Sequence, residues 1–405
     1  MNRKGKLLFS QQHGFLSRYL PFYVGVPVLI LVALMLSFAV NAFSSRPDNN
    51  EPIQPIPADQ LTTFNLGHGK TLADIIEYEN QARLFFVGES HTRLDHHLVQ
   101  LATLETLFQQ NPNVVLGVEW FQQPFQPHLD DYINGNISEA QMLHLTEYYN
   151  RWRYDYRLYQ PIMQFARKHK IPVIALNASA EVNRAVNEYE LDELPENLKS
   201  QLPDSYDWSD KAYEQRLRDT FNLHPEFSGK FEDFYKGQLT WDESMAYRAA
   251  SFLKDNPEHR MLVLAGSGHI EYGSGIPNRV KRHIDIPQVS ILITDGRDKL
   301  DKEVADYLVI SREKTVPANG LIGAFLETID NRLTITDFSK NSAARDAGIP
   351  KDSIIVSVDD NPVNTFADFK IAVLNKKPGD QIKLGYLANP EKKSTLIKTA
   401  SFDLR

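Results

Sequence analysis

Short runs of apolar residues recur along the middle of the chain, and no other sequence feature constrains the fold as strongly. They occupy residues 84–87, 114–118, 172–176 and 261–265, with a fifth at 289–293. None of these runs alternates apolar with polar residues, which is typical of strands buried on both faces of a parallel sheet. Segments with helical spacing separate them. This alternation predicts an α/β fold, with a mostly parallel sheet and flanking helices.

The segments between the runs have the apolar spacing of helices. After the first run, Leu94 and Leu98 begin such a pattern, and Thr92 with Asp95 resembles a capping box that would open the helix. Residues 180–258 are rich in Glu, Tyr and Leu. We expect them to form a long helical insertion before the fourth strand.

An apolar segment without charged residues lies near the N-terminus. Residues 20–43 would span about 36 Å as a helix, which is enough to cross a bilayer. Four cations precede the segment: Arg3, Lys4, Lys6 and Arg18. They predict a cytoplasmic N-terminus and a body outside the cytoplasm. The alternative is a signal peptide cleaved near Ala42, which places the body on the same side.

Charge and cysteine content exclude several classes of function. The formal net charge is −8, and residues 46–316 hold 28 basic and 41 acidic side chains. A body this acidic is a poor partner for nucleic acid, since that affinity comes mainly from cations on phosphates. The chain has no cysteine. This excludes disulfides, thiolate nucleophiles, zinc held by cysteine and a lipidated N-terminal cysteine.

Polar side chains follow each apolar run at the point where the predicted strand ends. Glu89 and His91 follow the first run, Glu119 the second, Asn177 the third and His269 the fourth. The carboxyl ends of parallel strands meet at one edge of the sheet, where ligands bind. The sequence therefore predicts that these side chains share a site.

The histidines near the first strand have different expected roles. His91 is expected at a helix N-terminus, where the positive helix end favours the neutral imidazole that a general base or metal ligand requires. His96 and His97 lie inside the helix, so at most one of them can face the site, and we expect a surface position or core packing for both. Glu89 has the alternative role of stabilising the helix start.

The same residues resemble the ChaN-like haem-binding family, part of the wider Tiki/TraB/erythromycin-esterase superfamily. The motifs are Gly88-Glu89-x-His91, Gly117-x-Glu119, the stretch from Trp152 to Tyr159, Ala175-x-Asn177, and Gly266-x-Gly268-His269 followed by Gly275-Ile276-Pro277. The resemblance covers about residues 60–295. It implies binding of haem or haem iron at the envelope of a Gram-negative cell, for iron uptake or handling. Characterised members are usually lipoproteins, so a membrane helix without cysteine departs from the pattern.

Two functions fit the residues of this site. Haem needs an apolar slot with an axial His or Tyr, and the aromatic residues 148–159 supply these types, although they also suit a packing or lid segment. The expected haem-binding residues are His91, Tyr154, Tyr159, Asn177, His269 and Tyr272. The alternative is a metal-dependent hydrolase with His91, Glu119 and His269 on a divalent metal. The superfamily's hydrolytic members imply that Glu89, His91, Glu119 and His269 would then be catalytic. A third hypothesis is a scaffold protein whose α/β site has lost its function.

After residue 316 the sequence pattern changes to short runs typical of β-strands and a single helix. Thr365 and Asp368 would cap that helix. This part resembles a bacterial PDZ domain over about residues 317–395. The resemblance implies that the loop Gly320, Leu321, Ile322 and Gly323 offers N–H groups to a peptide carboxylate, and that the next strand pairs with an extended peptide. An occluded groove with a packing role is the alternative.

The predicted organisation therefore has four parts. They are a cytoplasmic N-terminus with a transmembrane anchor (1–45), a linker (46–60), a ChaN-like haem-binding domain (61–312) and a small β-rich PDZ domain (315–400). The expected location is the inner membrane, with a single pass through residues 20–43 and the main body in the periplasm. The expected partners are haem or an iron complex, and a protein C-terminus or extended peptide.

Overall fold

The computed structural model describes residues 57, 62–65, 68–224, 229–296, 301–388 and 391–401. The predicted membrane segment, residues 20–43, lies outside these ranges, as does nearly all of the predicted linker. Within the described ranges, no helix has both the length and the apolar character needed to cross a membrane.

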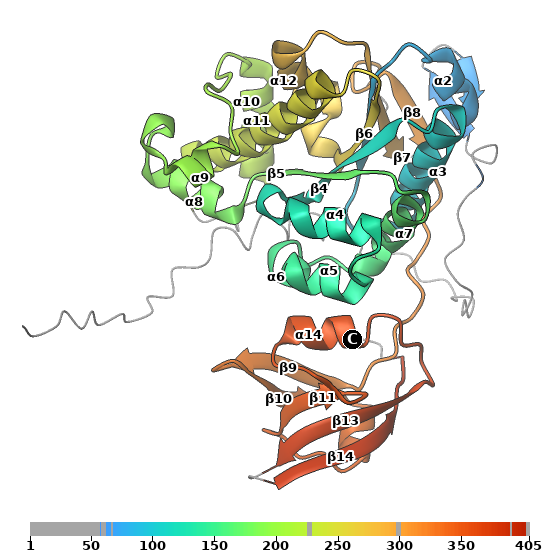
Figure 1. The fold of residues 1–405 in the computed structure, drawn as a ribbon, viewed down its shortest axis with the longest axis vertical. Coiled ribbons are helices and arrows are strands. Elements are labelled where there is room, and N and C mark those ends of the chain that lie inside the picture. Colours follow the sequence, from blue (N-terminus) through green and yellow to red (C-terminus); the bar gives the residue numbers. More distant parts are fainter. Residues whose placement is uncertain are drawn as a thin grey trace, which may run out of the picture.

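An eight-stranded sheet forms the centre of the larger domain (Figure 1). Its strands are β1 (Thr62–Asn65), β2 (His68–Thr71), β3 (Leu84–Glu89), β4 (Val114–Gln122), β5 (Val173–Asn177), β6 (Arg260–Gly266), β7 (Gln288–Thr294) and β8 (Tyr307–Ile310). The order across the sheet is β2-β1-β8-β7-β3-β6-β4-β5. The six strands from β8 to β5 are parallel, and β1 and β2 add an antiparallel edge. The predicted α/β fold and its five strands are confirmed, whereas β1, β2 and β8 were not predicted.

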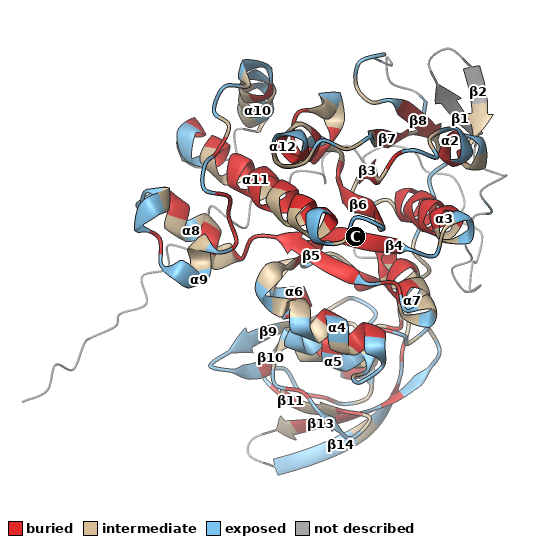
Figure 2. Ribbon diagram, turned by 45° about the horizontal axis from the view of Figure 1, so that its top comes forward, coloured by how far each residue is buried: buried red, intermediate tan, exposed pale blue. Residues whose placement is uncertain are grey.

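The central strands are buried on both faces, which explains why their sequences do not alternate. In β3, Phe85 and Val87 join the apolar core on one side of the sheet, and Leu84 and Phe86 join the core on the other side. Successive side chains of a strand point to opposite faces, so both sets must be apolar. Figure 2 shows β5 and β6 as buried along their whole length and β4 as buried up to its last residue.

Helices cover both faces of this sheet. On one side lie α2 (Leu72–Tyr78), α3 (Leu94–Gln110), α4 (Gln126–Asn134), α5 (Glu139–Leu145), α6 (Tyr148–Arg151) and α7 (Gln160–His169). On the other side lie α11 (Phe231–Asp255) and α12 (Ile276–His283). The capping box predicted at Thr92 and Asp95 is wrong. The N-cap of α3 is Arg93, whose side chain instead binds the Asp95 carboxylate with an N–O distance of 2.8 Å.

The predicted helical insertion before β6 is confirmed. It contains α8 (Ala180–Glu188), α9 (Glu196–Lys199), α10 (Lys211–Leu223) and the long helix α11. These helices pack around a small apolar core of their own. Three short 3₁₀ turns also matter for the site: η4 (Tyr156–Leu158), η6 (Ser267–His269) and η7 (Glu271–Gly273).

The C-terminal domain is an antiparallel β structure with two short helices. Its elements are β9 (Ala324–Ile329), β10 (Arg332–Phe338), α13 (Ala343–Asp346), β11 (Ile354–Val358), β12 (Asn361–Pro362), α14 (Phe366–Ala372), β13 (Gln381–Ala388) and β14 (Glu391–Lys398). The strand order β14-β13-β11-β10-β9 leaves β9 at one edge. Thr365 and Asp368 form the predicted capping box of α14.

The two domains touch through α14, which lies between its own sheet and the helices α5 and α6 (Figure 1). His144 Nδ1 on α5 lies 3.1 Å from Asp368 Oδ1. The guanidinium of Arg157 donates a 2.7 Å hydrogen bond to the carbonyl of Pro317 in the connection between the domains. Leu374, just after α14, is buried in the main core of the larger domain.

Candidate functional site

The strand order brings together the polar residues predicted at the strand ends. Strand β6 lies between β3 and β4, so the carboxyl ends of these three strands are neighbours. Glu89 ends β3, Glu119 lies in the last part of β4, and His269 lies in η6 directly after β6. This edge of the sheet is where ligands bind in parallel α/β folds.

Glu89 and His91 form a buried pair at the end of β3. The Nδ1–H of His91 donates to the Glu89 carboxylate, and Glu89 is almost completely buried. Burial alone lowers the pKa of His91, but the negative charges of Glu89 and Glu119 outweigh it and the pKa is raised. The two carboxylates thus act against the neutral form of His91 that the helix end was expected to favour. His91 precedes the start of α3 by three residues. The nearby carboxylates therefore have a larger effect on its pKa than the positive end of the helix has.

Glu119 is held by two donors from the β6 side. Its Oε2 accepts a 2.7 Å hydrogen bond from the backbone N–H of Gly266, and its Oε1 lies 3.4 Å from Nε2 of His269. Burial raises the pKa of Glu119, but His269, His91 and the Gly266 N–H together lower it to about 2. Glu119 is therefore an anion at neutral pH.

His269 lies between two carboxylates, one of which the sequence did not predict. Its Nδ1–H donates to Asp242 on α11 at 2.6 Å, and the other oxygen of Asp242 accepts a 2.5 Å hydrogen bond from the hydroxyl of Tyr213 on α10. Burial lowers the pKa of His269, but Asp242 and Glu119 together raise it well above its usual value. The one sequence signal for Asp242 is a charged residue amid the apolar positions of a long helix.

His96 and His97 both pack inside the domain, as predicted. The Nδ1 of His96 accepts the backbone N–H of Ser90 at 3.1 Å. The Nε2 of His97 lies 3.3 Å from the carbonyl of His91, and its ring packs on Tyr159. Both histidines thus support the loop that carries His91.

An aromatic pocket of about 240 Å³ opens over these polar residues. The ring of His91 contacts Trp152 and Tyr154, with ring centroids 4.8 and 4.9 Å apart. Trp241 of α11 and Arg216 of α10 lie on the side of the helical insertion. The pocket therefore has aromatic walls, histidine and carboxylate side chains at its floor, and an arginine in its lining.

Three of the site residues are close enough to share a metal ion. One ligand atom from each of Glu89, His91 and Glu119 lies within 4.8 Å of the other two. The predicted set of His91, Glu119 and His269 differs from this group, because both ring nitrogens of His269 face carboxylates.

The loop predicted to bind a peptide carboxylate is partly used within its own domain. The N–H of Gly320 donates to the carbonyl of Lys376 at 2.7 Å, and the N–H of Leu321 donates to Ala400 at 2.9 Å. Within the described ranges, the N–H groups of Ile322 and Gly323 have no protein acceptor. Two of the four predicted donors thus remain available.

Comparison with known families agrees with this architecture. The family model described as "Haem-binding uptake, Tiki superfamily, ChaN" matches residues 75–280, just over half of the chain. The chain belongs to the ChaN family. A PDZ domain model matches residues 320–399, so a PDZ domain follows the ChaN domain. No curated protein matches the chain.

Three solved structures are similar to parts of this chain. ChaN of Campylobacter jejuni, described with cofacial heme binding, shares 17% identity at a TM-score of 0.50, over 64% of this chain and 99% of that one. This likeness shows the shared fold. A serine endoprotease from Yersinia pestis matches 21% of this chain and 30% of its own, with 24% identity and a TM-score of 0.19. An HtrA-type protease AlgW with a decapeptide matches 22% and 31%, with 13% identity and a TM-score of 0.21. The chain spans less than a third of the length of these two proteases.

The remaining predicted haem residues of the ChaN domain lie outside the pocket. Tyr159 is buried behind Trp152, whose Nε1–H donates to the Tyr159 hydroxyl at 3.0 Å. Asn177 is buried at the end of β5 and does not line the pocket. Tyr272 lies beside the pocket, with its ring centroid 4.7 Å from the guanidinium carbon of Arg216 and with a left-handed backbone (φ 58°).

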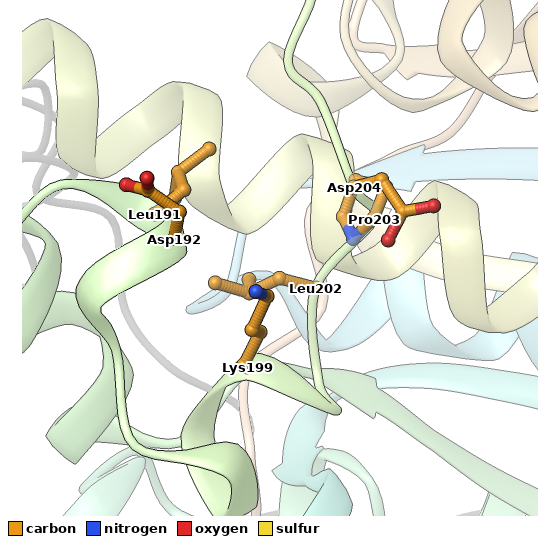
Figure 3. A pocket seen from close by; sticks show the side chains of 6 residues that line it. All are labelled: Leu191, Asp192, Lys199, Leu202, Pro203 and Asp204. Carbon is orange, nitrogen blue, oxygen red and sulfur yellow. The ribbon is translucent and has the colours of Figure 1, made fainter.

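The ChaN domain has a second, smaller pocket in its helical insertion (Figure 3). Its volume is about 140 Å³, and its lining is Leu191, Asp192, Lys199, Leu202, Pro203 and Asp204. It offers neither histidine nor aromatic groups. The aromatic pocket at the sheet edge is therefore the candidate site.

Proposed function

We propose that the ChaN domain binds haem or haem iron in the aromatic pocket and that the PDZ domain binds an extended peptide or a protein C-terminus. Family membership supports both halves of this proposal. The observation that carries the first half is the contact of His91 with both Trp152 and Tyr154 at the sheet edge.

The side chains of the pocket fit a haem group. Its aromatic walls suit a flat macrocycle, and His91 and Tyr154 are of the residue types that hold haem iron. Arg216 is suited to a propionate carboxylate. When bound, haem would supply the iron that these side chains hold. His269 fits the role of ligand poorly, because both its ring nitrogens face carboxylates.

Haem titration of the full chain tests this proposal. We expect a saturable shift of the Soret band, and we expect Tyr154→Phe or His91→Gln to weaken binding at least tenfold. Tyr78→Phe is the matched control, because Tyr78 is an exposed tyrosine that does not line the pocket. Absence of a saturable shift in the wild type would remove the haem proposal.

A metal-dependent hydrolase is the second candidate, and the grouping of Glu89, His91 and Glu119 is the observation in its favour. Carboxylate and imidazole are ligands of Zn²⁺ and similar ions. Metal analysis after dialysis against Zn²⁺ separates the two candidates. Stoichiometric retention that Glu89→Gln abolishes, in a chain that binds no haem, would favour the hydrolase.

We further propose a single-pass inner-membrane protein with its main body in the periplasm. The support is the charge-free segment 20–43 and the four cations before it. Membrane fractionation with N-terminal sequencing tests this. The expected result is an intact N-terminus in the membrane fraction and a body that externally added protease reaches in spheroplasts. A soluble chain that begins near Phe43 would show cleavage instead.

A further inference from the structure

The PDZ domain presents an open strand edge beside α14. Strand β9 pairs with β10 and has no second strand partner within the described ranges. Its side chains Phe325 and Ile329 are about half exposed. An edge strand offers free backbone donors and acceptors to an extended peptide. The following inference rests on the proposed peptide-binding function and adds the chemistry of the peptide.

Two faces of α14 are already covered. Phe369 and Val373 pack into the core of the PDZ domain, whereas Ala367, Ile371 and Leu374 pack against the core of the ChaN domain. The two sets lie on opposite sides of the helix. A ligand of the PDZ domain would therefore have to use a third face.

The third face of α14 carries Phe366 and Lys370 and lies next to β9. These two residues are one helical turn apart and so share a side. The backbone N–H of Phe366 donates a 3.0 Å hydrogen bond to the hydroxyl of Thr328 on β9. Phe366 is itself about half exposed. This face of α14 and the edge strand β9 thus lie side by side.

Lys370 is a partly buried cation on this face without a carboxylate partner. Its Nζ lies 4.8 Å from the ring centroid of Tyr149, on α6 of the ChaN domain, and 5.8 Å from that of Phe366. No carboxylate of the described ranges forms a salt bridge with it. The acidic residue that acts on it, Asp155, is held at 2.5 Å by Arg157. Burial lowers the pKa of Lys370, and the charge of Asp155 offsets this effect only in part.

We infer that the groove between β9 and α14 takes an extended peptide with an acidic side chain over Lys370, where Tyr149 of the ChaN domain forms part of the site. The peptide carboxylate would supply the salt-bridge partner that Lys370 lacks within the described ranges, in surroundings drier than an open surface. The N–H groups of Ile322 and Gly323 remain available for a terminal carboxylate. Binding specificity would then depend on both domains of the chain.

Selection from a phage library of random C-terminal octapeptides tests the inference on the full chain. We expect Asp or Glu to be enriched at one position. A fluorescent peptide with the selected sequence should bind about five- to tenfold more tightly than its Glu→Gln counterpart, as measured by anisotropy. Lys370→Gln should abolish this difference, and Lys370→Arg should keep it. Lys392→Gln is the matched control, because Lys392 is exposed on β14 at the opposite edge of the sheet.

The outcomes separate this inference from the proposed function on which it rests. Peptides selected without an acidic position, or an acidic preference that persists in Lys370→Gln, would overturn the inference while peptide binding stands. If no peptide is enriched, the proposed peptide-binding function is removed, and the inference with it. A dimer that competes with the peptide would show that a second copy of the chain occupies the groove, which also overturns the inference.

Discussion

At the scale of single residues, charge pairing controls the protonation of the site. The sequence places histidines and carboxylates at the strand ends, and it correctly predicts that His91, Glu119 and His269 meet. Their ionisation depends on distances that the sequence does not contain. Because Asp242 and Glu119 both contact His269, its imidazolium form is favoured over the neutral form that a metal ligand needs.

Glu119 should make the stability of the domain depend on acid. Its pKa falls from the ordinary 4.5 to about 2 on folding, so its stabilising effect is complete above pH 4.5 and is lost as the pH falls through 2. The expected loss is about 3 kcal/mol of unfolding free energy. Urea denaturation at several pH values measures it. Glu119→Gln should lack this slope, whereas Glu77→Gln, at an exposed position, should retain it.

Asp242→Asn should lower the pKa of His269 and destabilise the fold. The wild-type pKa of His269 is raised, so its stabilising effect is present below about pH 6.5 and is lost as the pH rises through the folded value. Breaking such a buried pair costs about 3 kcal/mol at pH 6, and less at higher pH. Histidine NMR titration and urea denaturation measure the two effects. Equal destabilisation by Asp204→Asn, at an exposed position, would contradict the prediction.

At the scale of elements, the sequence predicts what depends on local pattern and misses what depends on partners. The runs around Val87 and Leu264 reveal strands because burial on both faces excludes polar residues locally. Strand β8 was not predicted, although its four residues are apolar and mostly buried like those of the run at residues 84–87. Asp242 was missed because its partner His269 lies 27 residues away, after another strand, and helical spacing does not show what a residue faces.

The loop after β6 should tolerate one glycine substitution and reject another. A Cβ at Gly275 would lie 2.2 Å from the backbone oxygen of His269, whereas a Cβ at Gly268 would meet nothing within 4 Å. Gly275→Ala therefore should displace the His269 loop and cost about 1–3 kcal/mol, the usual range for overpacking. Gly268→Ala should leave thermal stability nearly unchanged. Calorimetry of the two variants checks this, and equal loss of stability would contradict it.

At the scale of the whole molecule, the PDZ domain contributes to the core of the ChaN domain. Leu374 belongs to the PDZ domain in sequence, yet it is buried in the same apolar cluster as Tyr148 and Tyr149. Neither domain resemblance predicts this contact, because each concerns one domain alone. The PDZ domain contacts helix α6 through Lys370 and Tyr149. Trp152 and Tyr154, which contact His91 at the pocket, follow directly after this helix.

Leu374→Ala should uncouple the two domains. Removal of a buried leucine side chain costs about 2–4 kcal/mol, and here the loss falls on the contact between domains. Calorimetry of the wild type should show one cooperative transition, because the domains share a core. The variant should show two transitions, and protease should cut first between residues 312 and 320. Leu396→Ala is the control, since Leu396 is 64% exposed on β14, far from the contact. A single unshifted transition in Leu374→Ala would mean that the buried contact does not hold the domains together.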